Sequence, residues 1–151
     1  MTGPGPVVVA TEVLSAALVR QGADQAAAYR AVVGVRPVVV SFATVAAVRV
    51  AAGRAGWNPA HQAQLEERLG RLRVVWPGPA LLDAYVELRS SCLQAGHPLA
   101  EPGREPACWI AATARWLGVP LVAADAAYQG VDGLDVLAAP VAPGIVEDRR
   151  G

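Results

Sequence analysis

Few side chains in this sequence stand at a spacing that chemistry requires. His61 and His97 each lack a neighbouring acid or a second histidine at ligand spacing, so neither indicates a zinc site or nucleophilic catalysis. Cys92 and Cys108 do not form a C-x-x-C pair, and we interpret both as reduced thiols of the core. Asp125 is better placed, because it lies just past an apolar run that is typical of a buried strand. Carboxylate oxygens of this kind are ligands for hard divalent cations.

Three hydroxyl side chains also lie close to the ends of apolar runs. Thr11 follows the first run, and Ser41 and Thr44 follow the second. Such hydroxyls could position a phosphate near a cleft, which makes all three candidate substrate-binding residues. Hydroxyls at helix starts also cap backbone N–H groups, and we expect Thr11 to cap a helix over residues 11–20.

The elements that must position these residues alternate between strands and helices. Short apolar runs predict strands at residues 7–9, 38–40, 72–76, 121–123 and 134–137. Periodicity and capping signals predict helices at residues 11–20, 24–33, 44–55, 59–69, 79–96 and 104–117. This alternation predicts an α/β fold in three layers, α/β/α, with a mainly parallel central sheet of four to five strands. Functional groups of such folds lie beyond the carboxyl ends of the strands, here at Ala10, residues 41–44 and residues 124–125.

Length, composition and charge narrow the possible classes of protein. The chain has 151 residues, 54% of them hydrophobic, and fits one domain, expected at residues 1–140 and followed by a tail at 141–151. Its formal net charge is zero, which excludes attraction to nucleic acid by a global field. No apolar run approaches the ~20 residues of a membrane-spanning helix, and no basic segment precedes the first run. We therefore expect a soluble, cytoplasmic protein.

Five strings of the sequence, in this order, resemble the PIN-domain ribonucleases of VapC type. They are VVVATEVLS at 7–15, SFATVAAVR at 41–49, WIAATA at 109–114, GVPLV at 118–122 and ADAAYQGVDGLDVL at 124–137. The resemblance therefore covers residues 7–137 and implies a PIN-like fold for the predicted domain.

The resemblance also implies a metal site, which this sequence largely lacks. In the family, acids from these strings hold Mg²⁺ or Mn²⁺, which activates a water against an RNA phosphodiester. The slots for three of those acids hold Ala10, Ala47 and Ala107, while the fourth keeps Asp125. Glu12 occupies a slot that is usually Asn or Asp. Asp125 and Glu12 are thus the residual catalytic candidates, and Asp125 is the residual metal ligand.

Two hypotheses follow from these departures. The first is a degenerate PIN domain that has no significant nuclease activity and needs no cofactor. It acts by binding a second copy of itself, an antitoxin-like protein or RNA, and it does not bind a membrane. The alternative is an active Mg²⁺- or Mn²⁺-dependent endoribonuclease toxin of a type II toxin–antitoxin system that uses Asp125 and Glu12, with Glu105 as a weaker additional ligand. A copy inactivated deliberately is a third possibility, and the further change to Pro106 favours natural loss.

Overall fold

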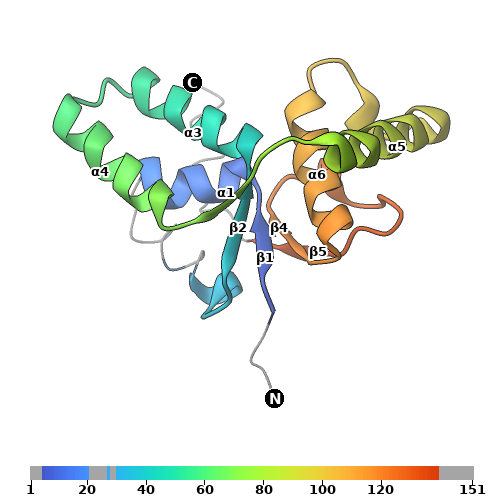
Figure 1. The fold of residues 1–151 in the computed structure, drawn as a ribbon, viewed down its shortest axis with the longest axis horizontal. Helices are drawn as coiled ribbons and strands as arrows, with labels where there is room; N and C mark the ends of the chain where they lie inside the picture. Colours follow the sequence, from blue (N-terminus) through green and yellow to red (C-terminus); the bar gives the residue numbers. More distant parts are fainter. Residues whose placement is uncertain (1–4, 21–26, 28–29, 140–151) are drawn as a thin grey trace.

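The computed structural model describes residues 5–20, 27 and 30–139 and arranges them around one sheet (Figure 1). The strands are β1 (Val7–Val9), β2 (Val38–Ser41), β3 (Arg73–Val75), β4 (Leu121–Ala123) and β5 (Val136–Ala138). The α-helices are α1 (Thr11–Ser15), α3 (Phe42–Arg54), α4 (Pro59–Gly70), α5 (Pro79–Ala95) and α6 (Glu105–Leu117). Shorter helical segments are the π-helical η1 (Ala16–Arg20) and the 3-10 segments η2 (Pro98–Ala100) and η3 (Ala126–Tyr128).

The sheet has five strands in the order β3-β2-β1-β4-β5, and every neighbouring pair is parallel. Val8 of the central strand pairs with Val39 on one side and with Leu121 on the other. The chain moves outward from β1 to β3 in one direction and from β4 to β5 in the other. The order therefore reverses between β1 and β4, and ligand sites of open parallel sheets lie beyond the carboxyl ends of the strands at such a point.

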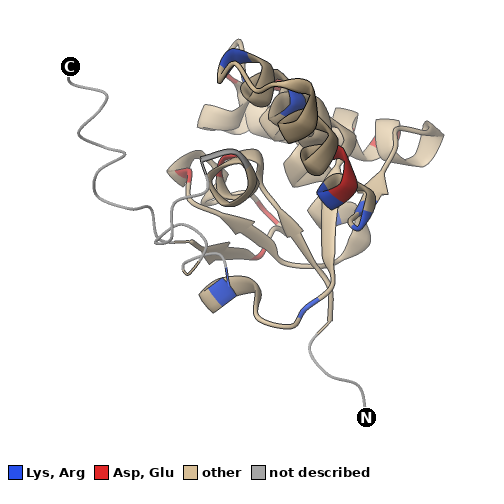
Figure 2. Ribbon diagram, turned by 90° about the vertical axis from the view of Figure 1, so that its left-hand side faces the viewer, with Lys and Arg blue, Asp and Glu red and all other residues tan. Residues whose placement is uncertain are grey.

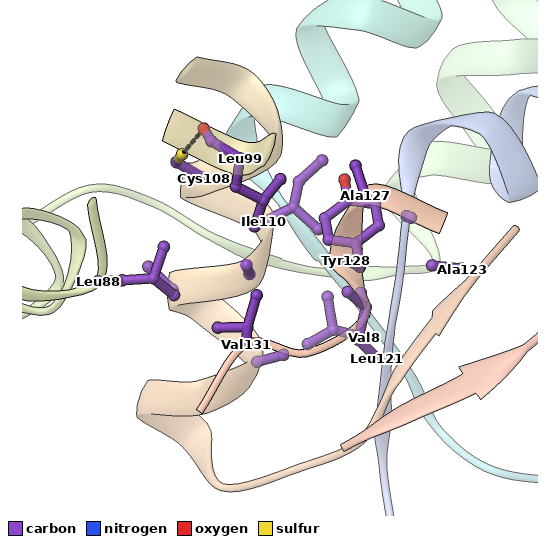
Figure 3. Close-up of a cluster of buried hydrophobic side chains, with 14 of the residues drawn as sticks. Val8, Leu88, Leu99, Cys108, Ile110, Leu121, Ala123, Ala127, Tyr128 and Val131 are labelled. Carbon is purple, nitrogen blue, oxygen red and sulfur yellow. Dashed lines mark hydrogen bonds between the residues drawn. The ribbon is translucent and has the colours of Figure 1, made fainter. Parts of the chain in front are cut away.

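Two apolar cores lie on opposite faces of the sheet. Val7 and Val9 pack with residues of α1, α3 and α4, whereas Val8 and Ala10 pack with residues of α5 and α6. Figure 1 shows these two helix groups on either side of the strands, and Figure 3 shows the side chains of the α5–α6 core. The near-continuous apolar strands follow from this arrangement, because each strand is covered on both faces.

The structure confirms the predicted fold class and the predicted parallel sheet of four to five strands. The start of one helix and the cap of another differ from the prediction. Helix α3 begins at Phe42, two residues before the predicted start, because the Ser41 hydroxyl accepts a hydrogen bond from the N–H of Ala43 at 3.1 Å. The prediction that Thr11 caps α1 is wrong. Ala10, in extended conformation, is the N-cap residue and provides no side-chain cap, and Thr11 is already helical.

The predicted helix at 24–33 lies partly outside the described residues, and its described residues 30–33 are helical. The predicted tail at 141–151 lies wholly outside the described residues. The last strand lies at Val136–Ala138 and not at 134–137. Within the described part of the chain, no helix has the length and apolar character needed to cross a bilayer.

Candidate functional site

The candidate site lies where β1 and β4 end side by side. Ala10 extends the pairing of these strands, because its N–H donates to the carbonyl of Val122 at 2.9 Å. The chain then turns directly into α1, which places Glu12 in the first turn of that helix. On the neighbouring strand, Asp125 follows β4 and is the N-cap residue of η3. The two residual acids of the sequence are thus brought together at the reversal point of the sheet.

Glu12 is held by the backbone of the opposite strand end. Its Oε2 accepts hydrogen bonds from the N–H of Ala124 at 2.9 Å and from the N–H of Asp125 at 3.0 Å. Hydrogen bonds to an ionised acceptor are roughly twice as strong as neutral ones. Glu12 therefore connects α1 to the end of β4 and occupies two backbone donors there.

Both oxygens of Asp125 also have partners within the chain. Oδ1 accepts a hydrogen bond from the N–H of Ala127 at 2.9 Å, and Oδ2 accepts one from Nη1 of Arg104 at 2.8 Å. The side chains of Arg104 and Asp125 are each 38% exposed, so this ion pair lies at the edge of the site and not in the core. The hydrogen bond and the negative charge of Asp125 raise the pKa of Arg104 above its ordinary value.

Arg104 is a site residue that the motifs of the sequence do not reveal. It is the N-cap residue of α6, and its backbone is fixed on both sides, with its N–H donating to Glu101 and its carbonyl accepting from Cys108. Its spacing carries a signal, because Arg104 stands three residues before Ala107, which is one helical turn. A cation one turn before a lost acid slot is a feature that sequence inspection could have used.

Of the three alanines that replace family acids, one is fully buried and two are half-buried. Ala10 is 0% exposed and belongs to the α5–α6 core, Ala107 packs against the same core, and Ala47 is half-buried on α3. Among the described residues, no group of three or more His, Cys, Asp or Glu side chains is placed to hold a metal ion. Mg²⁺ and Mn²⁺ require a shell of oxygen ligands. The donor set of this site therefore does not fit the metal that the family implies.

The hydroxyl candidates make contacts within the protein. Ser41 caps α3, and the hydroxyl of Thr11 donates to Oγ1 of Thr44 at 3.1 Å. Ser41 and Thr44 are both 0% exposed, whereas Thr11 is half-buried. The structure brings the three hydroxyls to the same end of the sheet but presents only Thr11 at an accessible surface.

Two further ionisable side chains border the site without adding a ligand. Tyr128 is 3% exposed, and burial together with the charges of Glu12 and Asp125 raises the pKa of its phenol far above the ordinary value. It stays neutral at physiological pH. Glu105, a weaker candidate ligand in the sequence, pairs instead with Arg89 of α5 at 3.4 Å.

Trp109 fixes the helices that frame the site. Its ring stacks on Tyr85 of α5 with a centroid distance of 4.0 Å and meets Phe42 of α3 edge to face at 5.2 Å. The tryptophan of the WIAATA string therefore joins α6 to α3 and α5. This contact sets the position of the helix that carries Arg104 and Ala107.

The match to a family model agrees with this architecture. Residues 7–134 match the PIN domain, and the chain therefore belongs to the PIN-domain family. Within that family, its fold is the one seen in toxin–antitoxin structures of VapBC type. No curated protein gives a significant match to the sequence.

Three solved structures illustrate the shared fold. A chain of VapBC2 from Rickettsia felis, bound to a DNA fragment from its promoter, is 17% identical with a TM-score of 0.70 over 89% of this chain and 99% of that one. A chain of FitAcB from Neisseria gonorrhoeae is 23% identical with a TM-score of 0.66, covering 87% and 96%. A chain of VapBC-5 from Mycobacterium tuberculosis is 22% identical with a TM-score of 0.62, covering 91% and 100%.

Proposed function

We propose that this PIN-domain protein acts by binding an antitoxin-like protein partner, as a homodimer, and has no metal-dependent nuclease activity of its own. The observation that carries the proposal is the state of the carboxylates. Three acid slots hold alanine, and the two acids that remain, Glu12 and Asp125, are already engaged by backbone N–H groups and by Arg104.

The loss of ligands is large compared with what metal sites tolerate. A change beside a metal ligand, without loss of the ligand itself, typically costs about 10–100-fold in affinity or activity. Replacing three ligand carboxylates by methyl groups removes both the oxygen donors and the negative charge that offsets dehydration of the ion. The alternative, a nuclease built on Asp125 and Glu12, would also require a metal ion to compete with the hydrogen-bond donors that these two side chains already have.

Exposed apolar side chains support a role in protein binding. Leu82, Val86 and Leu93 share one face of α5 and are 50%, 53% and 60% exposed. Exposed aliphatic side chains on one face of a helix are typical of an interface. Figure 2 shows the basic residues of the described chain dispersed over several elements, and the net charge is zero, so electrostatics favour a protein partner over RNA. Structurally similar chains come from complexes described as toxin–antitoxin assemblies, such as one from Klebsiella pneumoniae.

Metal binding and RNA cleavage test the catalytic half of the proposal. We expect calorimetric titration with Mn²⁺ to give no micromolar site and RNA to stay intact at millimolar Mn²⁺. Cleavage that requires millimolar metal and is abolished by Asp125→Asn would establish the nuclease alternative instead.

Partner binding tests the other half. The protein is used to isolate a small partner encoded beside its own gene, and the complex is then rebuilt from purified components. We expect Val86→Glu to weaken the affinity of that complex at least tenfold. Gln94→Glu is the control and should leave the affinity unchanged, because Gln94 is exposed and points about 100° away from the face of Leu82, Val86 and Leu93. A protein that stays monomeric, or that retains only RNA, would contradict the proposal.

A further inference from the structure

We propose that Arg104 is a built-in cation of this site, which neutralises the retained carboxylate from within the chain and opposes the entry of a metal ion. The inference rests on one part of the proposed function, the absence of metal-dependent nuclease activity, and does not depend on the identity of the partner. It assigns a role to a residue that belongs to none of the strings resembling the family.

The geometry of the ion pair carries the first step. Asp125 is the one acid slot of the family that this sequence keeps, and the 2.8 Å contact from Arg104 is made to its Oδ2. The other oxygen of Asp125 is bound to the N–H of Ala127. A divalent ion at Asp125 would therefore have to displace a charged hydrogen bond or lie beside a guanidinium.

The fixed backbone of Arg104 carries the second step. This residue ends the loop after η2 and begins α6, and both of its backbone groups are hydrogen-bonded. The guanidinium therefore extends from a fixed point at the rim of the site. An arginine side chain does not lose its proton in the accessible pH range, so the positive charge is permanent.

The charge balance of the site carries the third step. The carboxylate of Glu12 is compensated by two backbone N–H groups, that of Asp125 by Arg104, and the Tyr128 phenol is neutral because burial raises its pKa. No negative charge in this constellation lacks a compensating donor. The formal charges of Glu12, Asp125 and Arg104 therefore sum to −1. A doubly charged ion meets a site with only one net negative charge and with a like charge beside Asp125, which disfavours its binding.

The helical register extends the argument to a repaired site. Arg104 is the N-cap residue of α6, and Ala107 lies three residues later in the first turn of that helix. A carboxylate introduced at position 107 would lie within reach of the same guanidinium. Restoring acids alone would then create a second intramolecular ion pair in preference to a metal site.

The deciding experiment compares metal affinity in a repaired background. The repaired protein carries Ala47→Glu and Ala107→Asp and keeps Ala10, which is fully buried. Mn²⁺ affinity is measured by calorimetry for this protein, for the same protein with Arg104→Gln, and for a control with Arg89→Gln. Arg89 pairs with Glu105 in the first turn of the same helix, so the control removes an equal charge away from Asp125.

We expect Arg104→Gln to tighten Mn²⁺ binding at least about tenfold, or 1.4 kcal/mol, and Arg89→Gln to change it less than about twofold. Equal affinities with and without Arg104 would overturn the inference and leave the proposed function intact. Micromolar binding by the wild-type chain would instead overturn the proposed function.

A second measurement decides the case if the repaired proteins do not fold. Thermal unfolding of the wild-type protein and of the single variant Arg104→Gln is followed in chelator and in 10 mM Mn²⁺. A ligand at ten times its dissociation constant raises the melting temperature of a domain of this size by roughly 3–6 °C. We expect such a rise for Arg104→Gln alone, and equal responses of the two proteins would contradict the inference.

Discussion

The hydrogen bonds of Glu12 predict that this residue stabilises the fold in the absence of metal. Its Oε2 accepts from the N–H groups of Ala124 and Asp125 at 2.9 and 3.0 Å, and joins segments more than a hundred residues apart in the chain. A hydrogen bond to a charged acceptor contributes about 1.5–3 kcal/mol. Because Glu12 is half-buried, the lower end of this range, about 1.5 kcal/mol, applies to each of its two hydrogen bonds. Glu12→Ala is therefore expected to lower the free energy of unfolding by about 3 kcal/mol.

Thermal and chemical unfolding in chelator measure this loss. For a chain of 151 residues, 3 kcal/mol corresponds to a fall of roughly 6–12 °C in the melting temperature. Glu12→Gln keeps one carbonyl acceptor but loses the charge, so its effect should be about half as large. Glu67→Ala is the matched control, because Glu67 pairs with Arg71 on an open surface and should change stability by less than about 1 kcal/mol.

An unchanged melting temperature for Glu12→Ala would refute the reasoning. A carboxylate that waits for a metal should relieve repulsion when it is removed from the metal-free protein, whereas a carboxylate that binds backbone N–H groups should destabilise the protein when it is lost. The sign of the change therefore separates the two roles of Glu12.

Three other predictions concern the frame around the site. Trp109→Ala should cost about 3 kcal/mol in chemical unfolding, since the ring fills the junction of three helices, and Trp109→Phe should cost clearly less; equal losses would contradict a packing role. His97→Ala should cost about 2 kcal/mol because the ring accepts one backbone hydrogen bond and donates another, whereas the exposed His61→Ala should be nearly neutral. Burial raises the pKa of both Cys92 and Cys108, so a thiol reagent at pH 8 should modify them only as fast as the protein unfolds, and rapid modification of the native protein would contradict their burial.

The sequence predicts the sheet well because its signals are local. The valine runs of β1 and β2 are covered on both faces, so a continuous apolar run of three or four residues identifies each strand without knowledge of its neighbours. The start of α4 is equally local, since Asn58 accepts a hydrogen bond from the N–H of His61 within one turn. Parallel pairing then follows from the helices between the strands.

The site is less predictable because its decisive contacts are not local. Thr11 looks like a cap in its own segment, but its hydroxyl is used by Thr44, which is 33 residues away. The same holds for Glu12, whose partners lie beyond β4. The motif comparison assigns the lost acids to Ala10 at the end of β1, Ala47 in α3 and Ala107 in α6. It does not indicate Arg104, because a family pattern records the ligands of a metal and not their substitutes.

The three alanines and Arg104 are linked by electrostatics. Carboxylates gathered without a cation repel one another, and at a fully buried position such as Ala10 an unpaired charge would also lose its hydration. Methyl groups remove both costs, and Ala10 thereby joins the apolar core that covers β1. The acid kept at position 125 needs a permanent cation nearby, which Arg104 supplies. The loss of three carboxylates leaves one acid at position 125, and one cation, Arg104, is enough to compensate it. Returning a single acid to this site should therefore lower the free energy of unfolding unless a further cation accompanies it.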